Sequence, residues 1–285
     1  MGDITSPLRT KVFTSDLKNR RDFKINLDSY DHVFKNLKVT VKDAHYYVSD
    51  GTVPVIYKGK VGQPNAKTVS YNQVYFNQFM PIDSSRFAFR TISAKTKSFS
   101  LGTLTFNSGA KAVMHPEILT KQIDGIFDSD GTMVSSQQAY TIVYTYFYRN
   151  QFIVMDHDLK VKSIQNTIDT TKVAQVQTKT LSDGRTKMNA PPFKVNKLQT
   201  AVNHLLFNQS DLIGKNESSK RWKSSWSIDV YDIEKKQYAG SFYIPHQKGD
   251  KLTGLLATQE KLYVLTGDIL ICYRYRDQFS KTINR

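Results

Sequence analysis

One pattern recurs along the chain and restricts the folds that the chain can adopt. An aromatic and β-branched run, a turn and a second such run form "HYYVSDGTVPVIYKG" at 45–59, and "KLYVLTGDILICYRY" at 261–275 has the same form. Apolar alternation that is interrupted by a glycine-containing turn is typical of a β-hairpin. The chain therefore contains the same kind of hairpin at two positions that are far apart in the sequence.

A second repeated unit indicates how the hairpins are connected. The segments 11–27, 152–168 and 228–244 each consist of a strand ending near an Asp, a charged turn and a strand ending in Leu or Ile. Joined to the hairpin, this unit gives a four-stranded meander whose last turn recurs near residues 19, 62, 108, 158, 235 and 277. Four of the five intervals lie between 42 and 50 residues, and a period of about 40–50 residues is typical of propeller blades.

We therefore predict an all-β fold, namely a six-bladed β-propeller of four-stranded antiparallel blades that forms a single domain over 1–285. Blade 1 is expected to be incomplete at its N-terminal side, because only ten residues precede its third strand. Either an upstream piece, which could carry an export or anchor signal, would complete it, or a C-terminal strand would close the ring. The first strand of blade 4 is expected at 124–129. A pair of β-sandwiches built from unrelated hairpins remains the alternative.

The composition favours strands and anionic partners. The chain has 16 Tyr and 16 Phe, residues that are enriched in strands. Its one cysteine, Cys272, allows no intrachain disulfide, and its place in an apolar strand predicts a buried, unreactive thiol. The net charge of +15 favours an anionic partner such as nucleic acid, phospholipid, acidic glycan or acidic protein. No run of 18 apolar residues is present, so no transmembrane helix is predicted.

Motifs that would indicate a particular chemistry are missing from the sequence. There is no Gly-x-Ser-x-Gly elbow, His-Glu-x-x-His pair or glycine-rich phosphate loop. Asp124, Asp128 and Asp130 lie close together but lack the spacing of a calcium-binding loop, so we interpret them as turn-forming residues. The aromatic run 144–152 is interpreted as a strand packed between blades rather than a platform for nucleic-acid bases. We predict no metal site, cofactor or catalytic residue.

Two long insertions in blade 5 indicate a binding surface. They cover about 169–200 and 214–226, and strand alternation in a meander places both on the same rim. The first carries six basic and two acidic residues and the second four basic and one acidic, a joint charge of +7. Seven residues are predicted to contact a partner: Arg185, Lys187, Lys215, Lys220, Arg221, Trp222 and Lys223.

The two tryptophans are expected to differ. Trp222 is flanked by two basic residues in a serine-rich loop, so we expect it to be exposed and to anchor a partner. Trp226 alternates with Ile228 and Val230 at the start of a strand, so we expect it to pack inside the sheet stack. Solvated loops without a partner remain the alternative for this rim.

Several segments carry a resemblance to a known family. These are "YTYFYRNQFIVMDHDLKVKSIQNTIDTTKVAQV", "MNAPPFKVN" and "IDVYDIEKKQYAGSFYI", and most of the chain resembles the TolB-like six-bladed β-propeller proteins of Bacteroidetes. The resemblance implies an extracytoplasmic protein, in the periplasm or at the cell surface, held by an N-terminal signal or anchor. It implies no catalytic residues.

Two classes of function remain open from the sequence. The first is a non-catalytic binding or scaffold propeller that acts outside the cytoplasm in a cell-envelope protein assembly, with an acidic protein or envelope component as its partner. The second is a propeller enzyme, a lyase or hydrolase, acting on an acidic glycan at the propeller mouth. A role in binding nucleic acid ranks below both, because it is suggested by charge alone.

Overall fold

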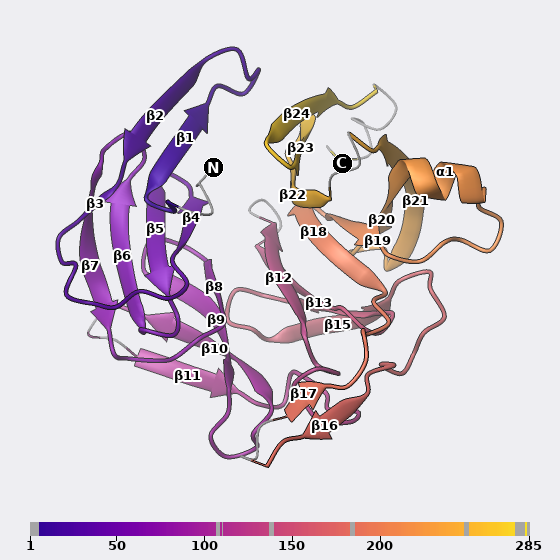
Figure 1. Ribbon diagram of the computed structural model, residues 1–285, viewed down its shortest axis with the longest axis horizontal. Coiled ribbons are helices and arrows are strands. Elements are labelled where there is room, and N and C mark those ends of the chain that lie inside the picture. Colours follow the sequence, from indigo (N-terminus) through magenta and orange to yellow (C-terminus); the bar gives the residue numbers. More distant parts are fainter. Residues whose placement is uncertain are drawn as a thin grey trace. The chain divides into compact units, whose positions relative to one another are not determined.

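The computed structural model describes residues 6–106, 109, 111–136, 140–182, 186–247, 251–276 and 283 (Figure 1). The chain divides into two compact units, Met1–Leu119 and Thr120–Arg285. The prediction that they form one domain stays a prediction. Among the described residues, no helix is both long and apolar enough to cross a membrane.

The first unit contains two multi-stranded sheets and a separate hairpin. The hairpin joins β1 and β2, one sheet has the order β3-β7-β6-β5-β4, and the other has the order β11-β10-β9-β8. The bounds are β1 Arg9–Phe13, β2 Arg20–Lys24, β3 Asn26–Leu27, β4 Lys38–Lys42, β5 His45–Asp50, β6 Val55–Lys60, β7 Asn65–Tyr71, β8 Gln78–Pro81, β9 Arg86–Ile92, β10 Phe99–Thr105 and β11 Lys111–His115.

The second unit contains three multi-stranded sheets, a short hairpin and the helix α1. The sheet orders are β12-β13-β14-β15, β18-β19-β20-β21 and β22-β23-β24, with the hairpin β16-β17 between the first two. The bounds are β12 Gly131–Ser136, β13 Thr141–Tyr146, β14 Gln151–Met155, β15 Val161–Asn166, β16 Thr178–Thr180, β17 Thr186–Met188, β18 Asn196–Val202, β19 Leu205–Ser210, α1 Ser219–Ser224, β20 Ser225–Asp232, β21 Gln237–Pro245, β22 Leu252–Ala257, β23 Lys261–Thr266 and β24 Ile269–Arg274.

These sheets are of the propeller-blade type. Consecutive strands pair in antiparallel meanders, so neighbours in the sequence are also neighbours in the sheet. Within the second unit the first strands of the three sheets lie together, because β18 contacts both β12 and β22. Within the first unit β4 likewise contacts β8. The prediction of an all-β fold built from meander blades is confirmed.

The prediction of six blades is wrong, because the described residues form five blades. The residues assigned to blade 1 form the two-stranded hairpin β1–β2 and the short strand β3. Strand β3 pairs in parallel with β7, with Asn26 opposite Asn65, and so extends the next sheet instead of completing its own. Among the described residues no further strand pairs with the hairpin, so it does not form a four-stranded blade.

The strand expected at 124–129 is also wrong, since this segment is a loop and the strand is β12. The carboxylate of Asp124 accepts the backbone N–H groups of Ile126 and Phe127 at 3.0 and 2.9 Å. Asp128 accepts the backbone N–H of Ile123 at 2.8 Å. These bonds satisfy donors that a strand would give to its neighbour, which confirms the interpretation of turn-forming aspartates. Over the described part of the chain, no three His, Cys, Asp or Glu residues lie close enough to hold a metal ion.

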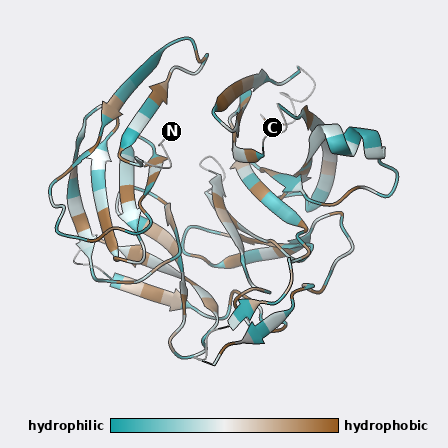
Figure 2. Cartoon of the chain, viewed as in Figure 1, coloured by the Kyte–Doolittle hydropathy of each residue, from teal (hydrophilic) through white to brown (hydrophobic). Residues whose placement is uncertain are grey.

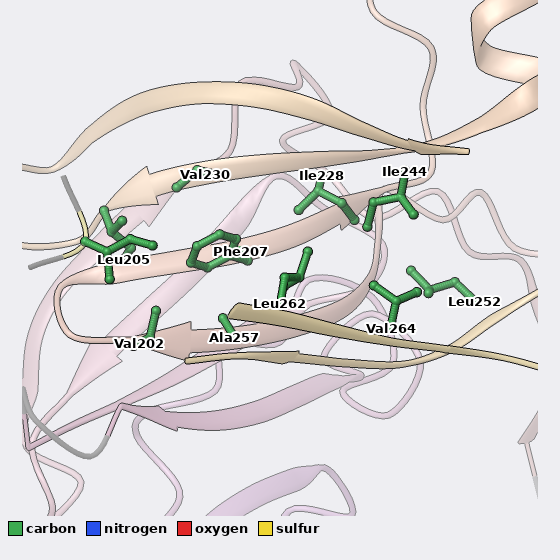
Figure 3. Packing of buried hydrophobic residues seen from close by; sticks show 11 residues of the cluster. Val202, Leu205, Phe207, Ile228, Val230, Ile244, Leu252, Ala257, Leu262 and Val264 are labelled. Atoms are coloured by element: carbon green, nitrogen blue, oxygen red, sulfur yellow. The ribbon is translucent and has the colours of Figure 1, made fainter. Parts of the chain in front are cut away.

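Apolar side chains on the faces of the sheets form the core. Figure 3 shows one cluster, where residues of β18–β21 pack against those of β22 and β23. Tyr144, Tyr146 and Phe152 of the aromatic run are fully buried, which confirms that this run is packed and not a surface platform. Cys272 is half-buried, so the prediction of a buried thiol was too strong. Its strand, β24, has only one strand neighbour among the described residues, which leaves it partly open.

Candidate partner-binding rim

The two insertions leave the β18–β21 sheet at the same end. The register pairs Asn196 with Ser210 and Ser225 with Pro245. The start of β18, the end of β19 and the start of β20 therefore meet at one rim, as strand alternation predicts. An ion pair between Lys197 Nζ and Asp211 Oδ1 at 2.5 Å links the start of β18 to the segment that follows β19.

The helix α1 presents most of the predicted site residues. It lies between β19 and β20 and contains no buried residue. Figure 2 shows it in mainly hydrophilic colours, outside the sheet that carries it. Its basic side chains and the preceding lysine are exposed, and its tryptophan is half-buried. We call these residues the α1 patch: Lys215, Lys220, Arg221, Trp222 and Lys223.

Contacts with β20 and β21 fix the position of Arg221. Its guanidinium carbon lies 5.0 Å from the centre of the Tyr243 ring, a cation–π distance. The Ser225 hydroxyl donates to the Arg221 carbonyl at 2.7 Å and so binds a carbonyl at the helix end. Desolvation and the nearby negative charge of Glu217 raise the pKa of Tyr243, so its ring stays neutral beneath the arginine. The α1 patch therefore contains a cation in a defined place.

Both tryptophans are half-buried, so the predicted difference in exposure is not found, but their neighbours differ. Trp226 lies in β20, packs against the core cluster of Figure 3, and has its ring centre 4.7 Å from that of His246. Trp222 lies on α1, where its backbone N–H donates to the Ser218 carbonyl at 2.9 Å. Trp222 is half-buried, not fully exposed as expected.

Of the remaining two predicted residues, the structure describes only Lys187, which does not lie beside α1. Lys187 is exposed on β17, opposite Lys179 in the small hairpin. Figure 1 draws this hairpin and α1 at well-separated places of the second unit. Arg185 lies outside the described residues. The candidate rim is thus limited to the segment between β19 and β20.

Sequence reasoning missed the partners that hold the patch. Tyr243 lies opposite Ser227 and next to Arg221, but in the sequence it is one of several aromatic residues of a strand. Glu217 accepts the backbone N–H of Gly214 at 2.9 Å, whereas the sequence shows only that it adds a negative charge to the segment. The period-2 alternation of β21 predicts on which face of the sheet Tyr243 lies. Its distance to α1 depends on the conformation of the segment between β19 and β20, which the alternation does not predict.

Comparison with known proteins supports the class of fold. No protein-family model and no curated protein matches the chain. A TolB-like protein of Agrobacterium tumefaciens superposes with a TM-score of 0.51 at 10% identity, over 91% of this chain and 78% of that one. A DUF4221 family member from Bacteroides vulgatus gives a TM-score of 0.48 at 12% identity, over 78% and 69%. Hydrazine synthase of Kuenenia stuttgartiensis gives 0.45 at 13% identity, over 83% of this chain but only 58% of that one.

These identities are low, so the likeness concerns the fold alone. The TolB-like structure and the meander topology together define the chain as one of the β-propeller class. In the part of the chain that the structure describes, this propeller-type fold has five blades.

Proposed function

We propose that this chain is a non-catalytic binding propeller that acts outside the cytoplasm, as part of a cell-envelope protein assembly. Its partner is an acidic protein or envelope component, and the α1 patch is the surface that binds it. The proposal includes the resemblance to the TolB-like propellers of Bacteroidetes, from which the extracytoplasmic location is taken.

One observation carries the proposal: a helix with no buried residue holds a half-buried tryptophan among three exposed cations, and a fourth, Lys215, lies in the segment before it. A helix without buried residues adds little to the core, and the composition of α1 is typical of an interaction hot spot. Arg221 is held over Tyr243, so less side-chain entropy is lost when it contacts a carboxylate. The four cations would also increase the association rate with an acidic partner at low salt.

The test uses fluorescein-labelled poly-L-glutamate as the acidic probe, followed by anisotropy at low and high salt. We expect saturable binding that weakens with salt, because exposed charges are screened beyond about 10 Å at 0.1 M. Trp222→Ala is expected to weaken binding by about 2 kcal/mol, which is about thirtyfold in Kd. Replacing Arg221 by Ala should weaken it as well.

Two variants serve as controls. Lys235→Ala removes an exposed lysine from the opposite end of the sheet and should leave probe binding unchanged. Trp226→Ala should instead lower the free energy of unfolding, by about 2–3 kcal/mol for a half-buried ring that packs on the core. If Trp222→Ala binds the probe as tightly as the parent, the α1 patch is a solvated loop and the proposal fails.

A further inference from the structure

A small cleft lies between two neighbouring blades of the second unit, away from α1. Its walls come from β15 on one side and from β20, β21 and their connecting turn on the other. Its volume is about 220 Å³, below the roughly 300–1,000 Å³ of cavities that enclose a whole drug-sized ligand. It therefore has room for one compact group of a larger ligand. The lining residues are Ile164, Gln165, Asn166, Tyr231, Lys236, Gln237 and Tyr238.

The aromatic wall of the cleft is held in place by hydrogen bonds. Tyr231 is 2% exposed, and its hydroxyl accepts the backbone N–H of Ile168 at 3.1 Å. Tyr238 is 42% exposed, with its hydroxyl 2.6 Å from that of Ser241. The two tyrosine rings are 5.8 Å apart between centres. One ring is therefore a fixed floor and the other is a partly open flat surface, available to the apolar face of a ligand.

The polar wall of the cleft consists of amide side chains. Gln165 is buried, and its Nε2 donates to the Ile233 carbonyl and to the Ser163 hydroxyl, both at 2.8 Å. Its carbonyl oxygen is a hydrogen-bond acceptor. Asn166 and Gln237 are exposed, and each carries donors and an acceptor. Neighbouring hydroxyl groups of a ligand can donate and accept at the same time, so they match such a set of amides.

A single cation completes the lining. Lys236 is exposed in the turn between β20 and β21, where its backbone adopts a left-handed conformation with φ of 56°. No other charged residue lines the cleft in the described part of the chain. An isolated ammonium group beside amides favours a ligand with one carboxylate rather than a densely charged polymer.

From these observations we propose that the cleft binds one hexuronate residue of an anionic oligosaccharide. The sugar ring stacks on Tyr238, its hydroxyl groups bond to Gln165, Asn166 and Gln237, and its carboxylate pairs with Lys236. This site is separate from the α1 patch and does not depend on the proposed function.

The test is calorimetric titration of the whole protein with trigalacturonate, its fully methyl-esterified form and neutral maltotriose. We expect trigalacturonate to bind and its methyl ester to bind at least tenfold more weakly, because the ester lacks the carboxylate. Tyr238→Ala should weaken trigalacturonate binding at least tenfold. Lys236→Ala should reduce the affinity for trigalacturonate to that for the ester.

Matched variants control for the fold and for charge. Tyr75→Ala removes an exposed tyrosine that does not line the cleft, and Lys235→Ala removes the neighbouring lysine. Both should keep the parent affinity, whereas Trp222→Ala tests the α1 patch separately. Circular dichroism of each variant establishes that it is folded.

Three results would overturn the assignment. The first is no saturable binding of trigalacturonate at millimolar concentration. The second is equal binding of the charged trimer and its ester. The third is tetraglutamate binding as tightly as trigalacturonate and losing that binding in Tyr238→Ala, which would assign the cleft to an acidic peptide instead.

Discussion

At the scale of single residues, two buried aspartates have pKa values that are shifted in opposite directions. Burial raises the pKa of Asp229, and the hydrogen bonds from Ser241 and Tyr231 do not outweigh it. Burial would also raise the pKa of Asp50, but hydrogen bonds from the backbone of Asn36, the Thr52 side chain and the backbone of Lys35 outweigh burial and lower it. The two carboxyl groups therefore affect stability in opposite directions as pH changes.

The prediction for Asp229 concerns the pH dependence of folding. A carboxyl with a raised pKa contributes stability below its ordinary pKa of about 3.9, and that contribution is lost as pH rises through the raised value. Asp229→Asn should therefore remove part of the decline in unfolding free energy above about pH 4. Urea denaturation monitored by circular dichroism from pH 4 to 8 measures this slope.

Asp50→Asn is the comparison of opposite sign. Because the pKa of Asp50 is lowered in the folded state, this carboxylate stabilises the fold at pH values above its ordinary pKa, and that stabilisation is lost on acidification. Asp50→Asn should therefore be less stable at neutral pH, and its unfolding free energy should decrease less as the pH is lowered. If Asp229→Asn changes the pH slope in the same direction as Asp50→Asn, burial does not control the charge of Asp229.

At the scale of elements, strand β12 approaches β13 so closely at Gly131 that this position has no room for a side chain. A Cβ atom added to Gly131 would lie 2.2 Å from the backbone carbonyl oxygen of Thr145 on the adjacent strand. No side-chain rotation relieves a clash with backbone, so β12 and β13 would have to move apart.

Gly131→Ala is therefore predicted to lower the unfolding free energy by about 1–3 kcal/mol. Gly214→Ala is the matched control, because its nearest neighbours would be at 3.5 Å, an ordinary contact. Its effect should stay within about 0.5 kcal/mol. Urea denaturation of both variants measures the difference, and equal stabilities would contradict the close approach.

The core cluster between β20 and β23 allows a second comparison of matched residues. Leu262 on β23 is 2% exposed and belongs to that cluster, whereas Leu256 on the neighbouring β22 is 56% exposed. Leu262→Ala should cost about 2–5 kcal/mol, since it removes buried methyl groups and leaves a cavity. Leu256→Ala should cost less than about 0.5 kcal/mol. Thermal or urea denaturation distinguishes them, and a large loss in Leu256→Ala would argue that its face is covered.

At the scale of the whole molecule, each of five core clusters lies within one of the two units. The clusters around Tyr57 and around Phe87 lie wholly within Met1–Leu119. Those around Phe207, Phe152 and Tyr148 lie wholly within Thr120–Arg285. Each unit therefore buries apolar surface of its own, which is the main favourable term in folding.

We predict that a fragment of residues 120–285 folds without the first unit. It should give a β-type circular dichroism spectrum and a cooperative urea transition, because three of its clusters need no residue from outside it. A fragment without a cooperative transition would show that the first unit contributes to its stability. Size-exclusion chromatography establishes whether the fragment is monomeric.

The sequence by itself determined the all-β class, the positions of most strands and the rim from which α1 emerges. It did so because period-2 alternation and turn residues act locally, and because strand alternation in a meander decides at which end each loop leaves. The same local rules identified Trp226 as a packed residue from its alternation with Ile228 and Val230.

Only the tertiary structure decided the number of blades, the place of β12 and the neighbours of each candidate residue. Residues 20–27 have the pattern of a strand whether they complete their own blade or extend the next one. The pairing of β3 with β7, which lies far along the chain, decides between the two. The cleft joins Gln165 to Lys236 and Tyr238, more than sixty residues apart, and Arg221 meets Tyr243 through a loop. Contacts of this kind depend on packing between sheets, and no local sequence pattern encodes them.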